Sequence, residues 1–446
     1  MPPPANAARS AASKREMTTG AAVTVAEFDR CLRPLLADDK PKSIAVAVSG
    51  GADSMALVLL TADWARKKRI AVLPLIVDHR LRAESTKEAR HVAGLLRRAG
   101  LTPKILTWDA KQKPSANRQA AAREARYALL SDACAKAGIR HLLLAHHRDD
   151  QAETVLLRAL RGSGVDGLAA MQPRATRDGL ILLRPLLDLP KVRLVATLKK
   201  RKQAWVEDPS NASLSFQRVR VRAALDLLSE NDAAVRAELV QHLAQTAKNF
   251  ARTRALLDAA AYDLLHASVQ LTPAGTAWLD PAALIAAEDD LALRALVKLL
   301  GAIGGLPVPP RLDGLQRLLD ALRGGKSLPL TLHRCLLSRV RGETHLLICR
   351  EARYLPEPAP LTSMLWDGRF RIAATKPVRG VSIAPLGKDR LSKDVALTAA
   401  LLPKVAWPAL PALRTAAGRL LAVPGLNWGE MPAGVTISFQ PALPAA

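Results

Sequence analysis

The sequence predicts an α/β protein in which a parallel sheet is covered by helices on both faces. Two observations lead to this fold class. Between residues 42 and 208, short apolar segments bounded by turn residues alternate with longer segments in which apolar residues recur every three or four positions, a pattern typical of βαβ units. The polar motifs of this region directly follow the apolar segments, and parallel sheets bind ligands at the carboxyl ends of their strands.

Four strands and four helices make up the predicted βαβ units. We expect the strands at residues 43–48, 70–77, 102–107 and 141–145. We expect the helices at residues 52–66, 85–98, 116–137 and 149–160. In this interpretation the sheet domain occupies residues 26–215, and residues 1–25 form a disordered tail.

The pattern of the chain changes twice after the sheet domain. Residues 216–325 are almost purely helical in pattern, with apolar residues at three- and four-residue spacing and glycine-rich stops. Residues 326–446 carry short alternating segments broken by prolines. We therefore expect a helical domain followed by a small mixed α+β domain.

Composition restricts the class of protein. The 446 residues include 65 Lys or Arg and 40 Asp or Glu, which gives a net charge of +25. This excess favours a nucleic-acid partner over a merely basic surface, whereas 3% aromatic residues argue against single-strand binding by base stacking. The four cysteines form no C-x-x-C pair, and no uncharged apolar run reaches the length of a membrane span. We therefore expect a cytoplasmic protein without disulfides or membrane contact, and leave its oligomeric state open.

The motif SGGADS follows the first predicted strand and opens the first predicted helix. Its glycines would let a phosphate approach the backbone, and N–H groups at the helix start would point at that phosphate. The lysine of a G-x-x-x-x-G-K-[ST] loop is absent. A carboxylate stands in the motif instead, which is unfavourable beside a phosphate unless a divalent cation bridges the two. The motif therefore predicts a site for Mg²⁺ and ATP, and the alternative is an ordinary turn capped by Asp53 or Ser54. The predicted ATP cradle comprises Ser49, Gly50, Gly51, Ala52, Asp53 and Ser54.

A second polar motif, HHRDDQAET, follows the fourth predicted strand. Asp150 and Glu153 are three residues apart at the start of a helix, so they share one face. Paired carboxylates suit metal binding or proton removal, and His146 precedes Asp150 by four residues and suits a role in orienting a ligand or moving a proton. The alternative is that the carboxylates only complement the helix dipole and that the histidines are surface residues at a strand end.

Two groups of arginines are candidates for phosphate contacts. Arg123 and Arg126 share a helix face, with Tyr127 adjoining them. In the segment FQRVRVR, positions 218 and 222 are one helical turn apart, whereas position 220 points elsewhere on a helix. The alternative for both groups is a solvated helix surface. The candidate substrate-contacting residues are Arg123, Arg126, Tyr127, Arg218, Arg220 and Arg222, with Gly162 and Gly164 in a glycine-rich loop that suits closure over a substrate.

Over residues 43–225 the sequence resembles a known family. The motif SGGADS resembles the PP-loop of the N-type ATP pyrophosphatases, whose fold is adenine nucleotide alpha hydrolase-like. Six further segments resemble the tRNA(Ile)-lysidine synthetases within that family. They are VDHRLRAES, NRQAAAREARYALL, the stretch LLLAHHRDDQAET with its continuation to residue 171, LLRPLL, VEDPSN and FQRVRVR. Val219 stands where this family usually carries Asn, so no polar role is transferred to that position.

The resemblance implies a ligase that joins L-lysine to C2 of the wobble cytidine of a tRNA(Ile) with a CAU anticodon. The reaction would use ATP and Mg²⁺, would pass through an adenylated cytidine, and would release AMP and pyrophosphate. Residues 26–215 would then be the catalytic domain, and residues 216–325 and 326–446 would bind tRNA. The resemblance implies catalytic roles for Asp53, His146, Asp150 and Glu153, magnesium binding by Asp53 and Asp150, and substrate contact by Asn211.

Two alternatives belong to other classes. A PP-loop tRNA thiolation enzyme would need a reactive cysteine near the nucleotide, and the only cysteines of this half, Cys31 and Cys134, lie outside the motifs. A non-catalytic RNA-binding or ATP-sensing protein would have no need for Asp53, Asp150 and Glu153 together.

Overall fold

The computed structural model describes residues 20–80, 84–108, 118–177, 179–207, 217–306, 308–325, 328–376, 378–389, 391 and 402–440. The chain divides into two compact units, Met1–Arg254 and Ala255–Ala446. The predicted boundaries near residues 25, 215 and 325 stay predictions about functional domains.

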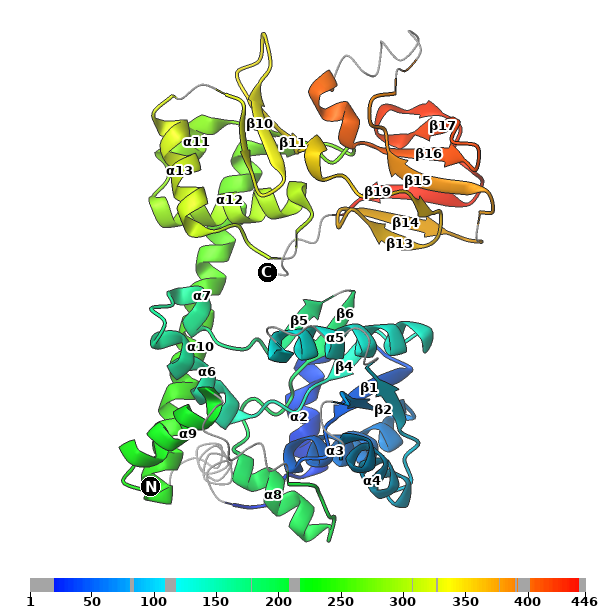
Figure 1. Ribbon diagram of the computed structural model, residues 1–446. Helices are drawn as coiled ribbons and strands as arrows, with labels where there is room; N and C mark the ends of the chain where they lie inside the picture. Colours follow the sequence, from blue (N-terminus) through cyan, green and yellow to red (C-terminus); the bar gives the residue numbers. More distant parts are fainter. Residues whose placement is uncertain are drawn as a thin grey trace, which may run out of the picture. The chain divides into compact units, whose positions relative to one another are not determined.

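The first unit is built on a six-stranded sheet with the order β3-β2-β1-β4-β6-β5 (Figure 1). All neighbours are parallel except β5, which runs antiparallel to β6. The strands are β1 (Ser43–Val48), β2 (Ala71–Asp78), β3 (Lys104–Thr107), β4 (His141–Leu143), β5 (Arg174–Arg177) and β6 (Leu180–Leu183). The helices are α2 (Val25–Leu36), α3 (Ala52–Lys68), α4 (Ser85–Arg98), α5 (Arg118–Lys136), α6 (Arg148–Ala159), α7 (Val165–Leu168), α8 (Lys191–Lys200) and α9 (Gln217–Leu228).

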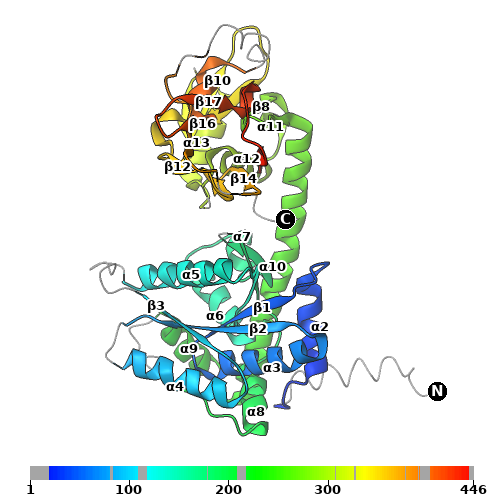
Figure 2. The ribbon, with the colours of Figure 1, turned by 90° about the vertical axis from the view of Figure 1, so that its right-hand side faces the viewer.

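Strand β1 shows how the sheet separates two apolar cores. Because successive side chains of a strand point to opposite faces, Ile44, Val46 and Val48 pack with α2, α3, α4 and α8 in one core. Ala45 and Ala47 face the other way, into a core that contains Leu130 of α5. Figure 2 shows α3 and α4 on one side of β1 and β2, and α5 on the other. The predicted fold class, with helices on both faces of a parallel sheet, is confirmed.

The predicted strands and helices of the first unit are all present, with shifted ends. Strand β4 ends at Leu143 rather than at residue 145, and β2 extends to Asp78. The sequence analysis did not predict α2, α8 or the β5–β6 hairpin. Helix α2 had a visible signal, because Thr24 and Glu27 form a reciprocal capping box at its start.

Helix α10 (Ala233–Ser268) has 36 residues and contains the boundary between the units. The second unit adds α11 (Pro281–Ala286), α12 (Asp289–Gly304) and α13 (Leu312–Arg323), which pack on a sheet of order β7-β8-β11-β10-β9. Strands β7 (Val269–Leu271) and β8 (Ala277–Leu279) lie within the segment that was predicted to be almost purely helical. They went unpredicted because each has only three residues.

The remaining strands of the second unit form small antiparallel sheets. Two further sheets have the orders β12-β15-β16-β17-β18 and β13-β14-β19. The strand bounds are β9 (Leu330–Leu332), β10 (Cys335–Arg339), β11 (Leu346–Arg350), β12 (Ala359–Pro360), β13 (Met364–Trp366), β14 (Phe370–Ala374), β15 (Val381–Pro385), β16 (Pro411–Thr415), β17 (Leu420–Val423), β18 (Trp428–Gly429) and β19 (Val435–Phe439). Among the described residues, no helix is both long enough and apolar enough to cross a membrane.

Candidate functional site

The SGGADS motif forms a tight loop between β1 and α3. Gly50 has a φ of +92°, and a Cβ at this position would lie 2.4 Å from Cγ2 of Val92, so the loop requires glycine there. The backbone N–H groups of Ser49 and Gly50 donate to Oγ of Ser54 at 3.1 and 3.2 Å. Among the described residues, no side chain caps α3 at Gly51, so its N-terminal N–H groups suit an anion.

The loop faces a cavity of about 340 Å³ at the carboxyl end of the sheet. Both predicted motifs and one predicted arginine group line this cavity. The lining includes Ser49, Gly51, Asp53 and Ser54 from the loop, Arg123, Arg126 and Tyr127 from α5, and His79 and His146 from the ends of β2 and β4. The structure therefore brings together residues that are nearly one hundred positions apart in the sequence.

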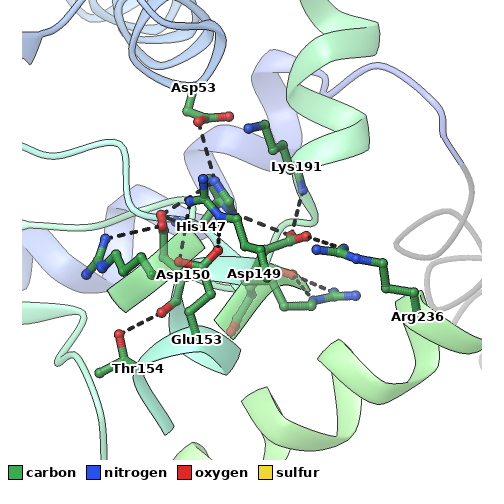
Figure 3. Close-up of polar contacts among 12 residues, drawn as sticks. Asp53, His147, Asp149, Asp150, Glu153, Thr154, Lys191 and Arg236 are labelled. Carbon is green, nitrogen blue, oxygen red and sulfur yellow. Dashed lines mark hydrogen bonds and ion pairs between the residues drawn. The ribbon is translucent and has the colours of Figure 1, made fainter. Parts of the chain in front are cut away.

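His147 lies at the centre of the polar contacts in this region (Figure 3). Its side chain is almost completely buried, and its Nε2 lies 3.4 Å from Oδ2 of Asp53 and 3.5 Å from Oδ2 of Asp150. Its Nδ1 lies 3.5 Å from Oδ2 of Asp149. Burial alone would lower the pKa of His147, but the carboxylates of Asp150, Asp149 and Asp53 raise it to about 10. His147 is therefore a buried cation that holds three carboxylates together.

His146 has the opposite electrostatic environment from its neighbour. Burial lowers its pKa to about 3, and Arg184, Arg218 and Arg126 act in the same direction against the raising effect of Asp150. Its Nδ1 is buried and has no hydrogen-bond partner among the described residues. His146 is therefore a neutral imidazole at pH 7 and a weak base, which suits hydrogen bonding to a ligand in the cavity rather than uptake of a proton.

Asp150 and Glu153 share one face of α6, as the spacing predicted, and both face α9. Arg222 Nε donates to Oε1 of Glu153 at 2.5 Å and Nη2 donates to Oε2 at 3.3 Å. Arg218 Nη1 lies 3.7 Å from Oδ1 of Asp150. Burial raises the pKa of Glu153 above its usual range, although Arg222 acts against this effect. In this structure Arg218 and Arg222 thus pair with carboxylates, so any phosphate that they bind would have to compete with these pairs.

The other predicted residues fall outside this cluster. Arg220 is exposed on α9, Gly162 has a φ of +67° in the turn after α6, and Gly164 is the N-cap of α7. Asn211 lies outside the described residues. Tyr127 is stacked between Arg123 and Arg177, whose guanidinium carbons lie 5.3 and 4.2 Å from the ring centroid.

Several site residues were missed by sequence reasoning. His147 and Asp149 lie inside the HHRDDQAET motif, but helical spacing singled out only Asp150 and Glu153. Asp78, at the end of β2, accepts hydrogen bonds from Ser85 and Thr86, which ties the β2–α4 connection to the sheet. The signal in the sequence that could have found Asp78 is an acidic residue at the end of an apolar strand.

Asp53 and Asp150, the carboxylates predicted to hold a divalent cation, both lie within 3.5 Å of Nε2 of His147. Oδ1 of Asp53 is buried and has no hydrogen-bond partner in the described part of the chain. The described residues include no group of three or more His, Cys, Asp or Glu side chains arranged around a metal position. Magnesium usually takes only one or two protein carboxylates and completes its shell with phosphates and water, so this donor set fits Mg²⁺.

Comparisons with known proteins decide the family. A family model described as a PP-loop domain matches residues 24–227. A tRNA(Ile)-lysidine synthase from Bradyrhizobium diazoefficiens is 41% identical over 286 residues, which cover 63% of this chain and 78% of that protein. The chain belongs to the tRNA(Ile)-lysidine synthase family. Among other lysidine synthases, that of Methylobacterium sp. (strain 4-46) is 42% identical over 71% of this chain and 92% of its own length. That of Brucella canis is 35% identical over 89% of both chains.

Membership of the lysidine synthase family confirms the resemblance found in the motifs. The positions of the cysteines also argue against the thiolation alternative, which needs a reactive cysteine near the nucleotide. Cys134 lies on α5 and is buried in the core between α5 and the sheet, and Cys31 lies on α2. Burial raises the pKa of both thiols to about 11, and neither residue lines the cavity. All four cysteines of the chain are free.

Proposed function

We propose that this chain ligates L-lysine to C2 of the wobble cytidine of a tRNA(Ile) with a CAU anticodon. The observation that carries this proposal is the single cavity that unites the loop at Ser49–Ser54 with His146 and the α5 arginines. This cavity combines an anion cradle, a neutral imidazole and the carboxylate of Asp53. The product would read A in place of G, so the codon read would change from AUG to AUA.

The first step transfers AMP to the tRNA. The C2 oxygen of the cytidine attacks the α-phosphorus of ATP, the bond between the α- and β-phosphates breaks, and pyrophosphate leaves. Backbone N–H groups at the start of α3, within the SGGADS loop, would cradle the phosphates. Asp53 and Asp150 would hold Mg²⁺, which when bound neutralises charge on the phosphates as the bond breaks. Arg123 and Arg126 would bind a phosphate on the opposite wall of the cavity.

The second step replaces AMP by lysine. The ε-amine of lysine attacks C2, the bond between C2 and the AMP oxygen breaks, and one proton must leave the amine. His146 lines the cavity as a neutral imidazole, and its low pKa suits it to orient the substrates by hydrogen bonding rather than to take up this proton. Glu153 contributes differently, since its carboxylate is buried and bonded to Arg222. We propose that Glu153 acts through Arg222 on the position of α9.

The large basic excess supports tRNA as the partner of the remaining chain. We propose that residues 216–325 and 326–446 bind the tRNA body and that the protein works in the cytoplasm, where tRNA is modified. Removal of the chain after about residue 215 should abolish salt-sensitive tRNA binding.

The proposed function is tested with radiolabelled L-lysine, ATP and two tRNA transcripts that carry a CAU anticodon. We expect ATP-dependent transfer of label to the tRNA(Ile) transcript and none to the tRNA(Met) transcript. Absence of label on the tRNA(Ile) transcript, with folded protein, would overturn the proposal.

A further inference from the structure

Asp149 links the start of α6 to two other helices. Its Oδ2 accepts the backbone N–H of Lys191, the first residue of α8, at 3.1 Å. Its Oδ1 lies 3.3 Å from Nη1 of Arg236 on α10. Burial would raise the pKa of Asp149, but contacts with His147, Lys191 and Arg236 hold it well below the usual range. Asp149 is therefore a charged acceptor that is fixed from two sides.

Arg236 is itself held in one orientation. Its Nε donates to Oδ1 of Asp226 at 2.5 Å, and its other end reaches Asp149. The Arg236 side chain is 28% exposed. Burial acts to lower its pKa, but the carboxylates of Asp226 and Asp149 raise it above the ordinary value of arginine. Two nitrogens of one guanidinium group, Nε and Nη1, thus contact two different carboxylates. Because the guanidinium group is planar and rigid, these two contacts together fix its orientation.

A series of ion pairs links α10 to the PP-loop. The series runs from Arg236 to Asp149, from Asp149 to Nδ1 of His147, and from Nε2 of His147 to Oδ2 of Asp53 (Figure 3). Oδ1 of Asp53 has no hydrogen-bond partner among the described residues. The orientation of Asp53 therefore depends on His147. The His147 ring is positioned by Asp150 at Nε2 and by an ion pair with Asp149 at Nδ1, which makes no hydrogen bond among the described residues.

We propose that Arg236 is a positioning residue for the adenylation step, acting through Asp149 and His147 on Asp53. The inference rests on the proposed function, because it assumes that Asp53 takes part in adenylation. Loss of Arg236 would leave Oδ1 of Asp149 without its ion pair, while Oδ2 keeps the Lys191 N–H and the ion pair with His147. The His147 ring and Asp53 would then sample additional orientations, and small displacements of a reacting group reduce rates by up to about 100-fold.

Helix α10 offers a matched control for a purely structural effect. Lys248, also on α10, pairs with Asp188 at 2.7 Å, and both side chains are about half exposed. This pair likewise ties α10 to the segment before α8, and among the described residues it contacts neither His147 nor Asp53. If Arg236 only held α10 in place, the two pairs would be comparable in their effect on the reaction.

The test measures single-turnover formation of tRNA-bound AMP from α-labelled ATP, with lysine omitted. Arg236→Met should lower this rate by about 10-fold or more, while the Kd values for ATP and tRNA stay within about twofold of wild type. Lys248→Met should keep the wild-type rate. The unfolding temperature of each variant, measured by circular dichroism, establishes that the protein is folded.

A second variant keeps the proposal testable if Arg236→Met does not fold. Arg236→Gln retains a donor for Asp226 but removes the charge opposite Asp149, and the same fall in rate is expected. A folded Arg236 variant with the rate of Lys248→Met would overturn the proposal, as would a fall explained entirely by weaker ATP binding. A wild-type protein that forms no adenylated tRNA would instead overturn the proposed function, so the two failures are distinguishable.

Discussion

Arg222→Met should destabilise the first unit, by an amount that depends strongly on pH. Glu153 has a side chain only 1% exposed, and Arg222 donates two hydrogen bonds to its carboxylate. Removing one partner of a buried ion pair costs about 3–5 kcal/mol. The lower end applies here, because the Arg222 side chain is 31% exposed and water can occupy part of its place.

Protonation of Glu153 sets an upper limit on the part of this cost that comes from burying an unpaired charge. A buried carboxylate without a partner can take up a proton, at about 1.36 kcal/mol per pH unit above its ordinary pKa. With an ordinary value of 4.5, the limit is about 3 kcal/mol at pH 7 and about 1 kcal/mol at pH 5. The sign follows from linkage: a folded-state pKa above the unfolded value means that the folded state binds more protons, so stability falls as pH rises.

The assay is urea unfolding of wild type and Arg222→Met at pH 5 and pH 7, followed by circular dichroism. The control is Glu153→Gln/Arg222→Met, which removes both charges and should recover most of the loss at pH 7. An equal loss at both pH values would refute the reasoning. A double variant as unstable as Arg222→Met would refute it as well.

Three further predictions concern the loop and the partner. Gly50→Ala should abolish ATP binding, because its φ is +92° and its Cβ would lie 2.4 Å from Cγ2 of Val92. Gly94→Ala on α4 is the control, because its Cβ would meet Nη1 of Arg98 at 3.8 Å and Gly94 does not line the cavity; equal ATP affinity of the two variants in equilibrium dialysis would contradict this prediction. Asp53→Asn should lose adenylation, because the substitution removes the charge of the carboxylate, while its tRNA affinity should stay within about twofold of wild type, because the surface that binds tRNA is unchanged. Retained adenylation in the α-label assay would argue against a role for Asp53. Affinity for tRNA should fall steeply with salt, with a slope of several units in a plot of log K against log salt concentration, and a slope near zero in filter binding would exclude a dominant phosphate contribution.

The sequence could predict the sheet because its strands and helices differ in length and period. Strand β1 and helix α3 are long, strongly apolar and separated by a motif of turn residues. The β5–β6 hairpin could not be predicted in this way, because β5 has the sequence RATR and β6 has only four residues. Short segments leave no measurable periodicity, and their pairing is decided by tertiary contacts.

The candidate site could be predicted only within single elements. Helical spacing correctly placed Asp150 and Glu153 on one face of α6, and Arg218 and Arg222 on one face of α9. Helical spacing does not show which face of α6 packs against which face of α9, so the pairing of these arginines with carboxylates was not foreseen. His147 was missed for the same reason, because three carboxylates surround it only after β1, β4 and α6 come together.

The central claim is that the chain activates tRNA by attack at the α-phosphorus of ATP. The most direct measurement incubates the protein with a tRNA(Ile) transcript and ATP labelled at either the α- or the γ-phosphate, without lysine. If the chain adenylates tRNA, the tRNA acquires the α-label and the γ-label appears only in pyrophosphate. Added lysine then releases the α-label as AMP. Release of the γ-label as inorganic phosphate, with no α-label on the tRNA, would contradict the account.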